Sequence, residues 1–324
     1  MADRPTASVL FPVQPKGLGR IAAFAALVHE GHARRLWVGQ SMGALETHQV
    51  LAALTVRFPG ISLGTGVTVT PLRHPYEAAL HARSLAALSG APFVAGYGPS
   101  YPSFQRAVLP SAYRSPRSAM EAYLHAARAL LEGRTVHHDS DAFTLHGSLE
   151  PLRAPPVEFG LGVLRPAMAH TAGRAADVAI TLMTPQRYVH EALVPALRAG
   201  AEEARRARPR IATMIHFAVS RPGRNLERLT HAGAWPNLTL PHYADMFRRA
   251  GIDVDPNDPA EGARRLLRSG GIVVGTPSDI ASALQEYRDC GVDEVVLNPA
   301  GVLITEGVDA AVQDLREVLA ADRA

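Results

Sequence analysis

Residues 61–98 contain two β-type segments that flank one helix-type segment. The first, residues 61–69 (ISLGTGVTV), is rich in β-branched residues, and the second, residues 92–97 (PFVAGY), ends at a Gly-Pro pair. Between them, leucines and alanines over residues 78–88 recur at helical spacing. This order and length predict a right-handed crossover between parallel strands, which commits the chain to an α/β fold.

Two pairs of glycines mark these strands. Gly64 and Gly66 lie within the first segment, and Gly96 and Gly98 lie at the end of the second. Glycine weakens a strand interior and often marks a close approach of the backbone to a ligand. Because α/β folds bind ligands at the C-terminal ends of their strands, the two pairs together predict a ligand floor there. Ordinary turn glycines are the alternative.

The rest of the chain supplies further β segments, most of them followed by a helix-type segment. Eight in all predict a (β/α)8 TIM barrel, with insertions after strands 4 and 7 and with residues 1–324 as a single domain. A doubly wound open sheet is the alternative, because periodicity does not separate the two. We expect the strands at residues 9–14, 35–39, 61–69, 92–97, 158–164, 178–183, 211–219 and 294–298.

Irregular stretches follow the fourth and seventh strands. Residues 98–115 predict a long polar and aromatic loop, and such loops in compact domains are usually functional or disordered. Residues 231–243 (HAGAWPNLTLPHY) predict a second loop, over a site or an interface. Residues 134–145 (RTVHHDSDAFTL) predict a small hairpin. We expect no metal there, because adjacent residues on a strand point to opposite faces.

Residues 161–167 (LGVLRPA) join a glycine-containing strand end to the start of a helix. Free backbone N–H groups at a helix N-terminus favour anions, so this stretch predicts a phosphate site. It lacks the Lys-Ser/Thr of a Walker loop and does not match GxGxxG.

Charge and cysteine content argue against several classes of protein. The net charge is +3 and the charges are dispersed, which disfavours nucleic-acid binding. The single cysteine, Cys290, excludes an intrachain disulfide and a multi-thiolate zinc site, and it favours a cytoplasmic location. No apolar run approaches the ~18 residues of a membrane helix, and residues 1–8 lack the pattern of a signal peptide, so neither membrane insertion nor export is expected.

Several motifs, in this order, resemble the bacterial luciferase-like superfamily of flavin- and deazaflavin-dependent oxidoreductases. The resemblance covers nearly the whole chain and implies a TIM barrel, in agreement with the strand count. The matching stretches are RLWVGQ (35–40), LGTGVTVTPLRHP (63–75), ALSGAPFVAGYG (87–98), LLEGRTV (130–136), HTAGRAADVAITLMT (170–184) and GVDEVVLNP (291–299).

Within the superfamily, WVGQ, RHP and AGRAADV with TLMT resemble the branch that uses the deazaflavin F420, and FMN is the alternative cofactor. The resemblance implies a tricyclic ring at the C-terminal mouth of the barrel, with a non-proline cis peptide behind it at Gly66-Val67. It also implies a homodimer and a separate reductase or dehydrogenase that supplies reduced cofactor. The cofactor-binding residues implied are Gly66, Val67, Gly96, Tyr97, Gly98, Gly162, Val163, Leu164, Arg165 and Thr184.

The chain departs from the deazaflavin sugar-phosphate dehydrogenases, which place Asp-His where it has Gln40-Ser41 and a carboxylate where it has Pro99. Oxidation of an alcohol needs a base at the carbinol. We therefore expect hydride delivery to a C=C or C=N bond of a small organic substrate. An FMN-dependent monooxygenase and a non-catalytic binding protein are the alternatives. Besides Gln40 and Ser41, we expect Tyr97 and Tyr101 to act in catalysis at the mouth.

Three other residues have competing interpretations. We expect His74 to cap the next helix or to bond a neighbouring loop rather than to contact substrate, and His216 to be a core histidine. Trp235 is either a lid over the ring or a dimer contact.

Overall fold

The computed structural model describes residues 6–40 and 42–324. At its centre, eight parallel strands pair side by side, and the last pairs with the first to close a barrel. This confirms the predicted (β/α)8 TIM barrel and excludes the open doubly wound sheet. In chain order the barrel strands are β1 (Ser8–Phe11), β2 (Leu36–Val38), β3 (Leu63–Thr65), β5 (Phe93–Gly98), β8 (Val157–Gly162), β9 (Val178–Leu182), β10 (Arg210–Val219) and β12 (Glu294–Asn298).

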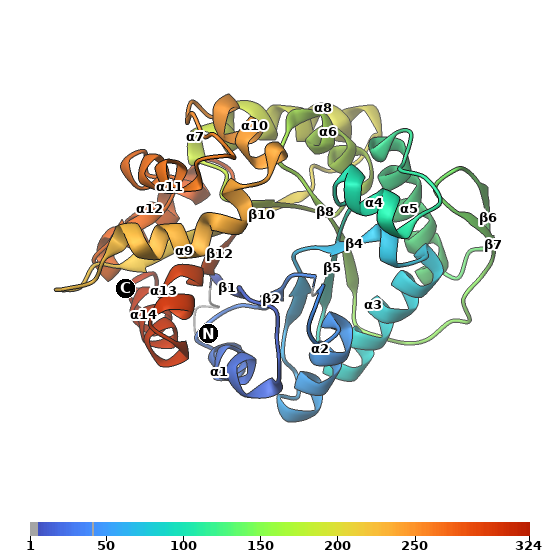
Figure 1. The fold of residues 1–324 in the computed structure, drawn as a ribbon. Coiled ribbons are helices and arrows are strands. Elements are labelled where there is room, and N and C mark those ends of the chain that lie inside the picture. The colour runs from blue at the N-terminus through green and yellow to red at the C-terminus, as the bar shows by residue number, and fades with distance from the viewer. Residues whose placement is uncertain (1–5, 41) are drawn as a thin grey trace.

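Helices surround the strands as an outer ring (Figure 1). Many begin with proline, whose missing N–H costs no hydrogen bond at the first helical position. Ser115 caps one of them, and Thr276 and Asp279 form a capping box on another. The ring contains α1 (Leu18–His29), α2 (Thr47–Arg57), α3 (Pro75–Ser89), α5 (Pro116–Leu131), α6 (Pro166–Ala175), α7 (Gln186–Tyr188), the π-helical turn η2 (Val189–Leu193), α8 (Val194–Glu203), α12 (Pro277–Asp289) and α14 (Val308–Ala321).

Further elements lie between the barrel strands, and one more, α13, follows the last strand. The chain forms a hairpin of β6 and β7, as predicted for residues 134–145. Every helix within the described residues is too short or too polar to cross a bilayer. The further elements are β4 (Thr68–Val69), η1 (Thr70–Leu72), α4 (Pro102–Val108), β6 (Val136–Asp139), β7 (Thr144–Gly147), α9 (Leu226–Leu238), α10 (Pro241–Arg249), α11 (Pro259–Arg268), β11 (Val273–Gly275) and α13 (Ala300–Thr305).

Two predicted loops are partly helical. Residues 98–115 contain α4, and much of residues 231–243 continues α9 through Pro236 into α10. Residues 231–238 are helical because α9 packs against α13. A Cβ atom added to Gly233 would lie 2.7 Å from the backbone nitrogen of Gly301, so the two helices touch through their backbones. This contact favours the helix despite a proline near its C-terminal end.

The two faces of each barrel strand alternate, because successive side chains of a strand point to opposite sides. In β5, Val94 belongs to a small cluster inside the barrel, together with Ile180 and Met214. Phe93 and Tyr97 belong to the larger cluster between the sheet and the helices. Residues at odd positions of β5 therefore face the helices, and those at even positions face the barrel interior.

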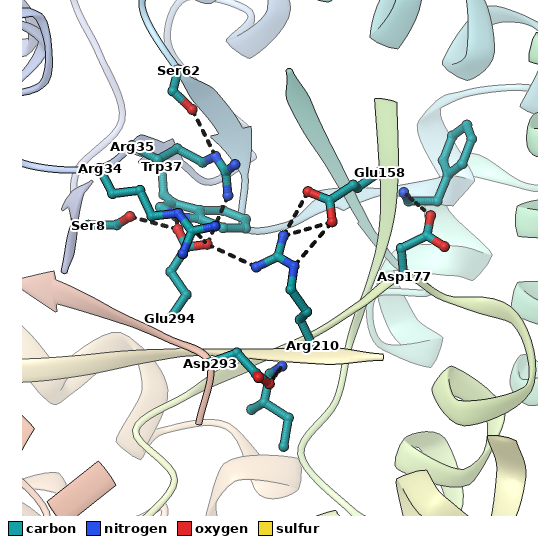
Figure 2. Close-up of polar contacts among 12 residues, drawn as sticks. Ser8, Arg34, Arg35, Trp37, Ser62, Glu158, Asp177, Arg210, Asp293 and Glu294 are labelled. Carbon is teal, nitrogen blue, oxygen red and sulfur yellow. Dashed lines mark hydrogen bonds and ion pairs between the residues drawn. The ribbon is translucent and has the colours of Figure 1, made fainter. Parts of the chain in front are cut away.

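A buried ion-pair network closes the N-terminal end of the barrel (Figure 2). Glu294, the first residue of β12, is 1% exposed. Its carboxylate accepts hydrogen bonds from Ser8 Oγ at 2.6 Å and from Trp37 Nε1 at 2.8 Å. The guanidinium groups of Arg35, at 2.9 Å, and Arg210, at 3.3 Å, pair with its other oxygen. The network occupies one end of the barrel, so a ligand must enter from the opposite end.

Candidate active site

A cavity of about 360 Å³ lies at the C-terminal end of the barrel strands. Its size is within the usual range for small-molecule sites. Apolar side chains from β9 and β10, including Ile180, Leu182 and Met214, form part of its wall. The other walls come from residues after β3, after β5 and after β8, and from the start of α10. The predicted ligand edge and the observed cavity thus coincide.

Three glycines give one wall of the cavity a bare backbone surface. A Cβ atom on Gly66 would lie 1.9 Å from Met214 Cε, and one on Gly98 would lie 3.0 Å from Val67 Cγ2. A Cβ atom on Gly162 would lie 3.4 Å from the same valine. The three glycines, Val67 and Met214 all line the cavity, and the peptide bond between Gly66 and Val67 is cis, as the resemblance implied. Glycine at these three positions therefore lets Met214 and Val67 pack directly against the backbone of this wall.

Gly96, which we expected to contact the cofactor, has a structural role instead. It lies outside the cavity lining, inside the barrel, where a Cβ atom would meet the carbonyl oxygen of Thr65 at 2.1 Å. The Thr65 hydroxyl donates to the Gly96 carbonyl at 3.1 Å and accepts from its N–H at 2.9 Å. Gly96 therefore permits close packing of β5 on β3 below the cavity.

Tyr97 does not reach the cavity, which contradicts its expected role as a proton donor. Its side chain is 1% exposed and lies behind the sheet, where its hydroxyl donates to the carbonyl of Ala78 at 3.2 Å. The ring lies near those of Tyr123 and Phe159. Burial raises the pKa of Tyr97 far above its ordinary value. The residue supports the packing of α3 on the barrel.

Tyr101 is the predicted catalytic residue whose side chain the structure brings to the cavity. It follows the turn at Ser100, whose φ angle is +61°, and it precedes α4. Gln105 of α4 holds this turn by donating to the carbonyl of Pro99 at 2.8 Å. The Tyr101 side chain is 40% exposed and packs near Phe104, so its hydroxyl can exchange protons with solvent.

Gln40 lies beside the cavity and outside its lining. Its side-chain oxygen accepts hydrogen bonds from Arg73 Nη1 at 2.8 Å and from the N–H of Val69 at 3.4 Å. Arg73 in turn pairs with Glu46. Gln40 therefore orders the segment after β3, and these bonds give no support to the direct catalytic contact that we expected. Ser41 lies outside the described residues.

The predicted phosphate segment does line the cavity. Gly162, Val163, Leu164 and Arg165 all contribute, and α6 begins directly after Arg165. The chain is fixed there because the Val163 N–H donates to the Ile180 carbonyl at 2.7 Å. The Tyr188 hydroxyl, from α7, donates to the Leu164 carbonyl at 3.0 Å.

Thr184, the last of the expected cofactor contacts, lies away from the cavity. It is fully buried, and its hydroxyl accepts a hydrogen bond from Thr181 at 2.9 Å. Its carbonyl accepts one from the Tyr287 hydroxyl at 3.3 Å. Thr181, three residues earlier, lines the cavity in its place.

His242 and Tyr243, which no sequence motif marked, line the cavity from the start of α10. Burial, and then the nearby Arg165, lower the pKa of His242 below its ordinary value. Burial raises the pKa of Tyr243. The available signal was weak: both residues end the stretch 231–243, which we expected to cover a site or an interface.

The two histidines for which we stated an expectation, His74 and His216, behave as expected. His74 caps α3 by accepting from the Tyr76 N–H at 3.2 Å, and its other ring nitrogen lies 2.8 Å from the Thr144 carbonyl. His216 is 4% exposed, and burial lowers its pKa to about 4. Trp235 lies on α9, half exposed and outside the cavity lining.

Comparison with solved structures shows the same fold in proteins of low identity. The F420-dependent tetrahydromethanopterin reductase from Methanopyrus kandleri has 19% identity and a TM-score of 0.75, over 98% of this chain and 99% of that one. An F420-dependent secondary alcohol dehydrogenase, solved with an F420–acetone adduct, has 15% identity and a TM-score of 0.76, over 99% and 100%. The FMN-bound oxygenating constituent of 3,6-diketocamphane monooxygenase from Pseudomonas putida has 13% identity and a TM-score of 0.71, over 96% of each chain.

The family comparison covers most of the sequence. The model of the luciferase-like monooxygenases matches residues 5–294. The barrel, its cavity at the C-terminal mouth and the glycine-lined wall agree with this match. The chain therefore belongs to the luciferase-like monooxygenase family, whose members are flavin- or F420-dependent oxidoreductases and monooxygenases.

Proposed function

We propose that this chain is an F420-dependent oxidoreductase that uses reduced deazaflavin to deliver hydride to a C=C or C=N bond of a small organic substrate. The observation that carries the proposal is the chemistry of the cavity lining. Its polar side chains are hydroxyl groups, one imidazole and one guanidinium, which donate hydrogen bonds readily. By the resemblance, Gln40 and Pro99 stand where the deazaflavin sugar-phosphate dehydrogenases have acid–base groups, and oxidation of an alcohol needs such a base.

The described residues fit a bound deazaflavin or flavin. Gly66, Gly98 and Gly162 line the cavity without a side chain of their own and would face a flat ring, and the apolar wall would shield that ring from water. At the other end, Arg165 and the N–H of Ala167 in the first turn of α6 would offer a cation and one hydrogen-bond donor to a phosphate, since Pro166 has no N–H and those of Met168 and Ala169 donate to the Arg165 carbonyl. F420 and FMN share these two requirements, and both cofactors occur among the structural neighbours.

The reduced cofactor, when bound, supplies the hydride, and the protein must then supply one proton to the product. The Tyr101 hydroxyl is our candidate for this donor because it lines the cavity and remains 40% exposed. Its Oη loses a proton to the substrate and regains one from solvent. His242 and Tyr243 of α10 also line the cavity, and they would orient the substrate or the ring.

A second candidate function is an FMN-dependent monooxygenase that uses reduced flavin and O₂. The apolar wall of Ile180, Leu182 and Met214 favours it, since oxygen chemistry on a flavin needs a site that excludes water. The FMN-bound neighbour supports it as well. In either case a separate reductase or dehydrogenase would supply the reduced cofactor. The homodimer implied by the resemblance and the cytoplasmic location favoured by the cysteine content remain predictions.

A single-turnover experiment separates the two functions. Purified protein is mixed without oxygen with reduced F420 and with a panel of enones and imines, and reappearance of the oxidised deazaflavin is followed by absorbance. The same panel is then tested with reduced FMN and O₂. We expect reoxidation of F420 that depends on substrate and proceeds without oxygen. The F420 assignment would be refuted if the only products were oxygenated ones, formed in the reaction with reduced FMN and O₂.

A further inference from the structure

Three arginines surround one carboxylate next to the cavity. Asp245 of α10 lies 3.0 Å from Arg249 Nε, 3.4 Å from Arg165 Nη1 and 4.0 Å from Arg248 Nη1. We call Arg165, Arg248 and Arg249 the arginine rim. Their side chains are 51%, 62% and 54% exposed, respectively, so each keeps donor groups that face solvent. One carboxylate against three guanidinium groups leaves a local excess of positive charge.

The arginine rim continues from the cavity. Arg165 lines the cavity itself. On α10, His242, Asp245 and Arg249 are three and seven residues apart, which places them on one face of the helix. His242 lines the cavity, so the same face extends from the cavity toward the C-terminal end of α10. From Asp245 to Arg249 this adds one helical turn, about 6 Å.

A ligand that uses the whole arginine rim must carry more than one anionic group. The single phosphate of FMN places its charge at one point, which Arg165 and the start of α6 would satisfy. The deazaflavin F420 carries a phosphodiester followed by a chain of glutamates, so its negative charges are spread along a flexible tail. An extended row of arginines fits this distribution, since guanidinium groups pair with carboxylates through two hydrogen bonds.

We propose that the arginine rim binds the polyanionic tail of the deazaflavin, with Arg165 at the phosphodiester and with Arg248 and Arg249 at the glutamate carboxylates. This inference rests on the proposed function and adds to it the basis of selectivity for F420 over FMN. Arginines in the last turn of a helix also interact favourably with the helix dipole. That role would affect the stability of α10 without making affinity depend on the length of the tail.

The test is a binding series that needs no turnover. The dissociation constants of the deazaflavin riboside, of F420 with one glutamate and of F420 with several glutamates are measured by fluorescence quenching, on the wild type and on the double variant Arg248→Gln/Arg249→Gln. For the wild type, we expect affinity to rise with each added glutamate and to weaken with salt. In the double variant, affinity for the long-tailed form should fall roughly tenfold per lost charge-assisted contact, and affinity for the riboside should stay unchanged.

The chain offers a matched control. Glu261 of α11 is likewise surrounded by three arginines, at 2.8 Å from Arg264, 3.1 Å from Arg265 and 2.9 Å from Arg268, and these residues lie outside the cavity lining. Arg268→Gln should leave the dependence on tail length intact. Riboside binding without any dependence on tail length would refute the arginine rim and leave the cofactor site standing. Failure of every form to bind would instead refute the proposed function.

Discussion

Removing the carboxylate of Glu294 should destabilise the barrel more than any surface substitution. Glu294→Ala deletes the partner of Arg35, whose side chain is 5% exposed, and leaves that guanidinium buried and largely uncompensated. It also removes the acceptor for Ser8 Oγ and Trp37 Nε1 (Figure 2). Arg210 can still pair with Glu158, so its charge stays compensated.

The magnitude follows from the burial of the pair. Breaking a buried ion pair by removing one partner costs about 3–5 kcal/mol of unfolding free energy. With an unfolding entropy of about 2.1 cal/mol/K per residue over 324 residues, each 1 kcal/mol lowers the melting temperature by about 1.5 °C. The expected decrease for Glu294→Ala is therefore about 4–7 °C.

Thermal unfolding followed by circular dichroism tests this value, with Glu158→Gln as the control. The Glu158–Arg210 pair is about 30% exposed on both sides, so its loss should cost no more than about 1 kcal/mol, or about 1–2 °C. Equal melting temperatures of Glu294→Ala and the wild type would refute the reasoning. They would mean that water or a rearranged side chain compensates the arginine.

The same network makes stability depend on pH. Burial alone would raise the pKa of Glu294, but Arg35 and the hydrogen bonds from Ser8 and Trp37 outweigh it, and the pKa is lowered. A lowered pKa means that the stabilisation is fully present above the unfolded carboxyl pKa of about 4.3, and is lost as pH falls through the lower, folded value. The wild type should therefore lose stability more steeply than Glu294→Ala below about pH 4.

Three further substitutions, the first with a matched control, test the site and the core. Tyr101→Phe should lower turnover by about 10²–10⁴-fold with unchanged cofactor affinity, whereas Tyr97→Phe should leave turnover unchanged, because its hydroxyl lies behind the sheet; equal kinetics for both variants would exclude Tyr101 as the donor. Gly96→Ala should cost about 1–3 kcal/mol or more of unfolding free energy, since its Cβ would lie 2.1 Å from the Thr65 carbonyl, and an unchanged melting temperature would contradict this packing. Thr213→Val should raise the free energy of unfolding by about 1–3 kcal/mol, because Thr213 Oγ1 is buried and has no hydrogen-bond partner among the described residues; a lower melting temperature would show that the hydroxyl has one.

The strand order could be predicted from sequence because parallel strands of a barrel are buried on both faces. Residues 178–182 (VAITL) and 294–298 (EVVLN) therefore appear as short runs dominated by apolar residues, with turn-forming residues between them. The glycine-lined wall was also predictable. Gly66 and Gly98 weaken strands that are otherwise rich in β-branched and aromatic residues. Glycine at such positions often marks a close approach of a ligand or of another part of the chain.

The position of Tyr97 behind the sheet could also have been predicted from sequence. Side chains alternate along a strand, so if Gly96 and Gly98 face the barrel interior, the residue between them must face the helices. The same alternation, applied to β10, places Met214 inside the barrel, where it lines the cavity.

The contribution of α10 could not be predicted in the same way. His242 and Tyr243 come to the cavity through the packing of a helix in the long connection between β10 and β12. Local periodicity identifies such a helix without giving its place on the barrel. The ion-pair network has the same origin, since Arg35 and Glu294 are 259 residues apart in sequence and meet when the barrel closes.

The most direct test of this account is a parallel titration of the purified protein with F420 and with FMN, followed by fluorescence quenching. Gly98→Val serves as the variant, because the Cβ atom of the new side chain would lie 3.0 Å from Cγ2 of Val67, which lines the cavity. We predict tight binding of F420, weak binding of FMN and loss of F420 binding in the variant. Tight binding of FMN with weak binding of F420, or F420 binding that survives Gly98→Val, would contradict the account.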